Sequence, residues 1–132
     1  ATYGGAIYNN GKLNILNVKF SGNACDVKGG VMIVLPKSKI SIESSLFKNN
    51  HAKEDGGVFY TMGEVNINDS EFRDNTADNN AGVFDAAESS KLRISNSNFE
   101  NNSAKKGNVI VNKGRFELTG TEISDSDIID ES

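Results

Sequence analysis

The chain repeats itself, and the period of the repeat restricts the possible folds more than any other feature of the sequence. A glycine-like pair followed by two apolar residues recurs every 25–27 residues, in units that begin near positions 4, 29, 56, 81 and 107. Each unit also contains an apolar–polar–apolar triplet, and a large apolar residue always stands seven positions after the first member of that triplet. A spacing that never varies marks the part of each unit that must stay in register with its stacked neighbours.

The units have the pattern of strands and turns. The triplets alternate with the period of two that is typical of β-strands, and no stretch shows the helical period of 3.6. The remaining positions are rich in Asn, Asp, Gly and Ser, which favour turns. We therefore expect an all-β fold, a right-handed single-stranded parallel β-helix (solenoid) of about five coils with three short strands each. Such coils stack at ~4.8 Å, and parallel crossovers are overwhelmingly right-handed.

The repeat also predicts how the chain is divided. We expect β-helix repeats over residues 1–124 and an acidic C-terminal cap or linker over residues 125–132. The units that begin near 29 and 81 carry two extra residues before the triplet, within 34–38 and 86–90. Insertions in a repeat array map to outer loops, so we place a turn there. The chain opens directly in the repeat pattern, and we expect a fragment of a longer protein whose repeats continue end to end.

Residues at equivalent positions of stacked units form columns along the rod. We expect three columns to be structural, an aromatic one, an aliphatic one and a ladder of asparagines. The aromatic column is Phe20, Phe47, Phe72 and Phe99, continued by Ile123. The aliphatic column is Ile15, Ile42, Ile67 and Ile94, and the ladder is Asn23, Asn50, Asn75 and Asn102, with Ser126 in the last unit. Cys25 is expected to be a small buried residue.

Two adjacent apolar columns follow the glycine pairs, and the pattern leaves open which of them faces inward. The first column contains Val31, Val58 and Val83, and the second contains Met32, Phe59 and Phe84. The next position admits a charge, Asp85, and is expected to lie outside.

Composition excludes several classes of function. Only 36% of the residues are hydrophobic, and no run of apolar residues is long enough to span a membrane. An isoelectric point near 5.0 argues against nucleic acid as a partner. The single cysteine cannot form an internal disulfide, and the Cys/His spacing of a zinc site is absent. We therefore expect no metal and no cofactor.

Four units pair a glycine motif with an FxxN motif, as in Gly4-Gly5-Ala6-Ile7 with Phe20-Ser21-Gly22-Asn23. These motifs resemble the GGAI/FxxN repeats of chlamydial polymorphic outer-membrane protein passengers, and they are similar to those of adhesin-like proteins of methanogenic archaea. The resemblance implies a β-helix displayed outside the cell for adhesion.

The sequence thus predicts a non-enzymatic, extracellular stalk or binding module that contacts a cell-surface protein or glycan. The expected contact residues are outward side chains, namely Tyr8, Lys39, Tyr60 and Lys91. One alternative is a carbohydrate-active β-helix, a polysaccharide lyase or hydrolase, that uses Asp55, Asp78 and Asp85. Units that differ by at most two residues offer no long loop to wall a catalytic cleft, which argues against it. The other alternative is a structural spacer without a ligand.

Overall fold

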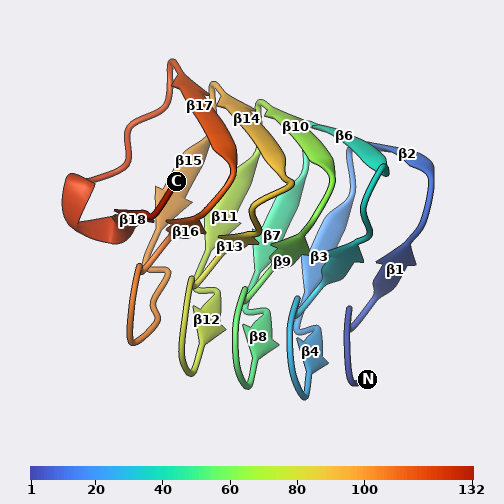
Figure 1. The fold of residues 1–132 in the computed structure, drawn as a ribbon, viewed down its shortest axis with the longest axis horizontal. Helices are drawn as coiled ribbons and strands as arrows, with labels where there is room; N and C mark the ends of the chain where they lie inside the picture. The colour runs from blue at the N-terminus through green and yellow to red at the C-terminus, as the bar shows by residue number, and fades with distance from the viewer.

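The computed structural model describes residues 1–132, which form a β-solenoid of about four turns (Figure 1). The N-terminus lies at one end of the rod, and every strand pairs in parallel with strands of the adjacent coils. The expected parallel β-helix is therefore confirmed. None of the helical structure in the chain is long and apolar enough to cross a bilayer.

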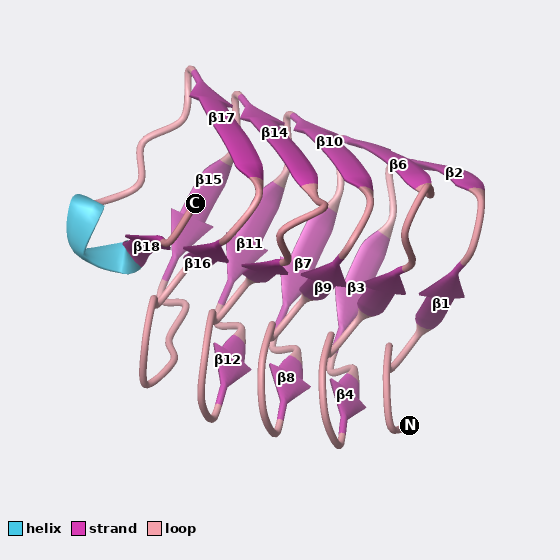
Figure 2. Cartoon of the chain, viewed as in Figure 1, coloured by secondary structure: helices cyan, strands magenta, loops and turns pink.

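Four parallel sheets run along the rod (Figure 2). The first three coils contribute one strand to each sheet, whereas the coil of β15 adds none to the three-stranded sheet. The six-stranded sheet contains β1 (Ile7–Asn9), β5 (Met32–Val34), β9 (Phe59–Thr61), β13 (Phe84–Ala86), β16 (Ile110–Asn112) and β18 (Ile128–Asp130). The five-stranded sheet contains β2 (Lys12–Leu16), β6 (Lys39–Glu43), β10 (Glu64–Asn68), β14 (Lys91–Ser95) and β17 (Arg115–Thr119). The four-stranded sheet contains β3 (Lys19–Ser21), β7 (Leu46–Lys48), β11 (Glu71–Arg73) and β15 (Asn98–Glu100). The three-stranded sheet contains β4 (Ala24–Cys25), β8 (His51–Ala52) and β12 (Thr76–Ala77).

Two of the expected numbers differ from the structure, which has four strands per coil and about four turns. The additional strand is two residues long and carries the small residues Cys25, Ala52 and Ala77 on its buried side. Two residues are too few to show a period-two alternation, so the sequence pattern does not reveal this strand. The fifth unit forms β16 and β17 but adds no strand to the four-stranded or three-stranded sheet, and the last turn stays incomplete.

Equivalent residues of successive coils lie directly over one another in the core. Phe47 is paired with Phe20 on one side and with Phe72 on the other, and Phe72 is paired with Phe99. The aliphatic column is paired in the same way, as Ile42 with Ile67 and Ile67 with Ile94. The interior is therefore a set of apolar columns, because each coil repeats the same inward-facing positions.

Both apolar columns that follow the glycine pairs face inward, since the chain bends between them. Val31 and Met32 are both fully buried, as are Val58 and Phe59. The carbonyl oxygen of Val58 accepts the backbone N–H groups of both Val31 and Met32, at 3.0 and 2.9 Å. The same pair of bonds recurs in the next coils, at the carbonyl oxygens of Val83 and Val109, and the register stays one residue to one. The backbone therefore bends at this point in each coil, and both side chains face the core.

The asparagines form a hydrogen-bonded ladder next to the aromatic column. Asn75 donates from Nδ2 to the carbonyl oxygen of Phe47 and to Oδ1 of Asn102, both at 3.0 Å. Its own Oδ1 accepts the backbone N–H of Asn50 at 3.1 Å. Each amide thus satisfies backbone groups that the corner between two sheets would otherwise leave buried without a partner.

The segment after β17 leaves the regular path of the coil. It passes through the 3₁₀ turn η1 (Asp125–Asp127) and returns as β18, which pairs with β16. Ile123 packs against the core, but the residues around it form no strand beside β15. Ser126 lies exposed in η1, so the asparagine ladder ends at Asn102. The segment expected to be a cap or linker contains η1 and β18.

Candidate functional site

The outer side of the six-stranded sheet is partly covered, although its residues point away from the core. Tyr8 at the N-terminal end is 64% exposed, whereas Ile33 and Asp85 are only 4% and 8% exposed. This column lies outside the core, as expected, but Ile33, Asp85 and Val111 are covered and not exposed to solvent. Lys28 on one side, together with Met62 and the turn residue Ala87 on the other, lines a shallow pocket over this part of the sheet.

An ion cluster centred on Lys28 lies on this face. Its Nζ is 3.1 Å from Oδ2 of Asp55 and 4.0 Å from Oδ2 of Asp85. The same ammonium lies 4.5 Å from the centroid of the Tyr60 ring, within the range of a cation–π contact. One cation thus joins two carboxylates and an aromatic ring that come from three successive coils.

The glycine pair that follows Lys28 explains its position. Gly29 has a φ of +73°, in the left-handed region that an L side chain avoids, and it turns the chain sharply before β5. Lys28 itself forms an isolated parallel bridge with Asp55, and Asp55 forms one with Asn80. Residues that precede the glycines therefore form their own column beside the six-stranded sheet, within reach of its outer side.

The carboxylate of Asp55 is held from a second direction as well. Its Oδ1 accepts the backbone N–H of Asn80 at 3.1 Å and lies 3.3 Å from the Nδ2 donor of Asn79. With Lys28 on Oδ2, both oxygens of this carboxylate have partners. Asp55 is therefore a fixed anchor for the cluster.

Lys28 and Asp85 in this cluster have shifted pKa values. Burial raises the pKa of Asp85 to about 6, and the charge of Asp55 acts in the same direction against the opposing charges of Lys28 and Lys113. Burial works against the charged form of Lys28, but its hydrogen bond to Asp55 and the neighbouring acidic groups outweigh burial and raise its pKa. At neutral pH we therefore expect a charged Lys28 and an Asp85 that is close to its titration range.

The cluster borders an open pocket of about 420 Å³. Its lining combines the Tyr60 ring, the charged groups of Lys28, Asp85 and Lys113, and the hydroxyl of Ser89. An aromatic face next to fixed charges and a hydroxyl can stack on an apolar group of a ligand and hydrogen-bond its polar groups. The arrangement suits non-covalent recognition of a polar surface.

The four expected contact residues lie on two different faces. Tyr8 and Tyr60 belong to the outer column of the six-stranded sheet, with Tyr60 half-buried beneath Lys28. Lys39 and Lys91 begin β6 and β14 of the five-stranded sheet, on either side of Glu64 in the register. Lys39 forms an exposed ion pair with Glu64 at 3.7 Å. The structure does not bring the tyrosines and the lysines into one site.

The three candidate catalytic carboxylates are also divided. Asp55 and Asp85 share Lys28, whereas Asp78 is exposed and lies 3.2 Å from Nε2 of His51, beside the three-stranded sheet. Hydrolysis of a glycosidic bond uses two carboxyl groups that face each other across the substrate. Asp78 does not take part in such a pair with the other two.

Sequence reasoning did not identify Lys28 as a member of the site. The signal was present in the column that precedes each glycine pair, which reads Tyr3, Lys28, Asp55, Asn80 and Lys106. An adjacent Lys and Asp in such a column predict an ion pair between coils. The distance from this column to the outer side of the six-stranded sheet depends on the turn at the glycines, which the sequence alone does not give.

One unit of the solenoid matches a known repeat. Residues 44–62 match the family model described as the Chlamydia polymorphic membrane protein repeat. This segment contains Phe47-Lys48-Asn49-Asn50 and Gly56-Gly57-Val58-Phe59, one copy of each motif that carries the resemblance. No curated protein and no solved structure matches the chain. The similarity to the chlamydial repeat is therefore confirmed for the unit that contains β7, β8 and β9.

Proposed function

We propose that this β-solenoid is a binding module of a cell-surface, adhesin-like repeat protein. In this role it is non-enzymatic and extracellular, and it contacts a protein or a glycan of another cell. The chlamydial repeat that residues 44–62 match is named for a membrane protein, and this supports the location. Nucleic acid is a poor partner for a chain with a net charge of −4.

The outer side of the six-stranded sheet is the proposed contact face. The observation that carries this assignment is the Lys28 cluster, in which a cation, two carboxylates and the Tyr60 ring are held in fixed positions by three coils. Preorganised polar and aromatic groups lose little conformational entropy on binding, which favours affinity. Tyr8 extends the same column toward the N-terminal end and adds an exposed ring.

A binding experiment with variants of both faces tests this assignment. The wild-type chain, the double variant Tyr8→Ser/Tyr60→Ser and the double variant Lys39→Ser/Lys91→Ser are applied to a glycan array and to intact cells. We expect the tyrosine variant to lose at least tenfold in binding and the lysine variant to bind as wild type does. Equal binding by the wild type and both double variants, with unchanged unfolding midpoints, contradicts the proposed face.

A carbohydrate-active role is the second candidate, and one observation favours it. The pKa of Asp85 is raised to about 6, which suits a general acid that works near neutral pH. The test is incubation with acidic and neutral polysaccharides, with and without calcium, and analysis of the product sizes. Cleavage that disappears in Asp85→Asn supports this candidate and contradicts a purely adhesive role.

A further inference from the structure

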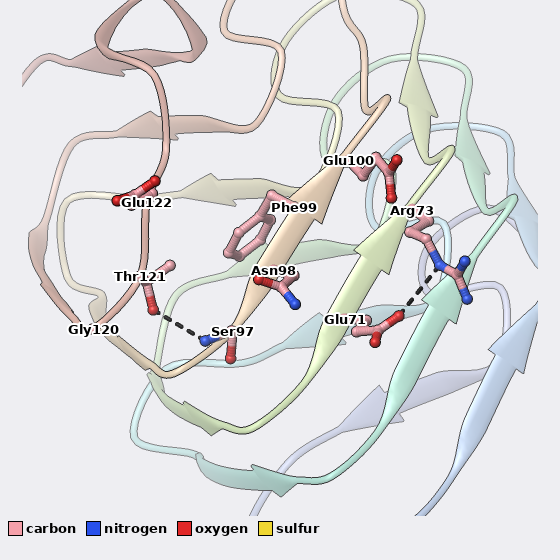
Figure 3. A pocket seen from close by; sticks show the side chains of 9 residues that line it. All are labelled: Glu71, Arg73, Ser97, Asn98, Phe99, Glu100, Gly120, Thr121 and Glu122. Carbon is pink, nitrogen blue, oxygen red and sulfur yellow. Dashed lines mark hydrogen bonds and ion pairs between the residues drawn. The ribbon is translucent and has the colours of Figure 1, made fainter.

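The four-stranded sheet ends in an open edge at β15. In the regular coils the next strand of this sheet covers that edge, but the fifth unit supplies none. The Oγ1 atom of Thr121 still accepts the backbone N–H of Ser97 at 3.1 Å, as the equivalent serine does in each preceding coil. Beyond Thr121 the chain moves away from β15 toward η1, as Figures 1 and 3 show. The position of one strand beside β15 is left vacant.

The backbone of β15 offers hydrogen bonds to that vacant position. Asn98 donates its N–H to Ser70, and the carbonyl oxygen of Glu100 accepts the N–H of Asp74, so both residues face the preceding coil. Successive residues of a strand in a parallel ladder address opposite neighbours. The N–H and C=O groups of Phe99 and the N–H of Asn101 therefore point to the side where no strand lies.

Two openings flank this edge, and they differ in chemistry. The outer one, about 900 Å³, is lined by Glu71, Arg73, Asn98, Glu100 and Glu122, with Phe99 as its one apolar residue (Figure 3). The inner one, about 700 Å³, is lined by Phe99, Val109, Leu118 and Ile123 together with four polar residues. The side chains of an extended strand alternate between two faces, so a strand at this edge directs them alternately into these two openings.

We propose that the β15 edge binds an extended peptide segment of a partner protein, in parallel orientation, by addition of a strand to the four-stranded sheet. The segment carries an aromatic residue opposite Phe99, a lysine or arginine opposite Glu100 and an asparagine opposite Asn102. Addition of a peptide strand to an exposed sheet edge is a general mode of peptide recognition.

The aromatic preference follows from the stack of rings. Phe20, Phe47, Phe72 and Phe99 stack with centroids 4.7–4.9 Å apart, and the outer face of the Phe99 ring has no further aromatic partner. A ring on the added strand lies at the same spacing and continues the column. It also occupies the apolar opening beside Val109 and Leu118.

The preference for a cation follows from charge. Glu71 is paired with Arg73, with Oε2 and Nε 3.3 Å apart, whereas Glu100 and Glu122 form no ion pair. Two unpaired carboxylates beside one edge favour a positively charged side chain there.

The asparagine preference follows from the ladder. The backbone N–H groups of Asn50 and Asn75 each donate to Oδ1 of the asparagine in the next coil, and Asn102 has no such acceptor.

The chain itself supplies a suitable probe. A synthetic peptide with the sequence of residues 46–52 contains Phe47, Lys48 and Asn50 at the required spacing, and it begins just after the position that Thr121 occupies beside Ser97. Two control peptides carry Phe47→Ser or Lys48→Glu. Binding of each labelled peptide to the whole chain is measured by fluorescence polarisation, and amide hydrogen exchange is followed by NMR. We expect the amides of Phe99 and Asn101 to exchange at least tenfold more slowly when the first peptide binds, with little change at Asn98.

A charge swap separates recognition from general attraction. The variant Glu100→Lys should bind the lysine peptide about three- to fivefold more weakly and bind the Lys48→Glu peptide more tightly than wild type does. Glu43→Lys carries the same change of charge on the five-stranded sheet and should bind all peptides as wild type does. No slowing at Phe99 and Asn101, or equal slowing by the Phe47→Ser peptide, overturns the proposal. Slowing that depends on protein concentration without peptide also overturns it, because a second copy then occupies the edge.

Discussion

The rings of Phe47 and Phe72 lie face to face, with centroids 4.7 Å apart and planes 4° from parallel. This separation is the distance between neighbouring strands of a sheet, so the backbone ladder fixes the spacing of the rings. Phe72 also meets Phe99 in the same stacked geometry and touches Phe84 edge to face. The ring of Phe72 therefore connects its own coil to both adjacent coils.

Replacement of Phe72 by alanine should remove about 3–5 kcal/mol from the free energy of unfolding. The ring is fully buried, and its loss leaves a cavity between Phe47 and Phe99. Chemical denaturation monitored by circular dichroism measures the change. Phe99→Ala is the matched control and should cost less, because Phe99 is only partly buried at the end of the stack. Equal stability of wild type and Phe72→Ala contradicts the prediction.

Loss of the Asn75 amide should destabilise the chain by about 3 kcal/mol. In Asn75→Ala the carbonyl oxygen of Phe47 loses a donor and the N–H of Asn50 loses its acceptor, and buried polar groups without partners are costly. Asn23→Ala should cost about 1 kcal/mol, because Asn23 lies half-exposed at the end of the ladder and donates only to Asn50. Thermal and denaturant unfolding of both variants test the difference. If both variants lose a similar amount of stability, the hydrogen bonds of the ladder are not the cause of the destabilisation.

Gly57→Ala should destabilise the solenoid by about 3 kcal/mol. A Cβ atom at this position would lie 2.6 Å from the backbone oxygen of Thr76 and collide with that of Gly82 in the next coil. Neither backbone group can move without a change in the spacing of the coils. Gly22→Ala is the control, since its Cβ would meet nothing within 4 Å and only its φ of +68° is unfavourable. The control should lose about 1 kcal/mol, and a larger loss there than in Gly57→Ala argues against crowding.

The raised pKa of Asp85 predicts a loss of stability as the pH rises. The unfolded chain releases this proton near pH 3.8 and the folded chain near pH 6, so the folded state binds more protons between these values. Stability from this group is therefore complete below about pH 4 and is lost as the pH rises toward 6, by about 3 kcal/mol. Asp85→Asn should lack this loss and should exceed wild type by about 3 kcal/mol at pH 7.

Denaturation curves between pH 4 and pH 8 measure this difference, with Glu43→Gln as a control for the removal of an exposed carboxylate. If the stability advantage of Asp85→Asn over wild type grows toward low pH and not toward neutral pH, the pH dependence has the wrong sign for a buried acid. Such a result would show that the Asp85 carboxylate is stabilised by Lys28 more than it is opposed by burial.

Much of the fold follows from the spacing of a few residue types. The constant interval between each triplet and its phenylalanine predicts that Phe47 and Phe72 lie in adjacent coils, and the register pairs them. The longer turns near Pro36 and Glu88 lie between the six-stranded and five-stranded sheets, where the extra residues are inserted. These features are predictable because each depends on one repeat unit and its copy.

The features that the sequence does not reveal depend on how different columns meet. The double acceptor at Val58 is a property of the backbone path, so side-chain alternation cannot show it. The contact between Lys28 and Asp85 joins positions two coils apart. It depends on the direction of the turn at Gly29, which the sequence does not give. The departure of the chain after Thr121 follows from the degenerate fifth unit, which loses the phenylalanine and the asparagine at Ile123 and Ser126.

The two longer turns lie in alternate coils on the same border between two sheets, after β5 and after β13. Two coil spacings separate them, about 10 Å along the rod. Since the register of the strands tolerates the additional residues there, we expect both turns to accept inserted sequences while the strands keep their pairing. Two epitopes inserted in this way would be displayed side by side, at a distance that the spacing of the coils fixes.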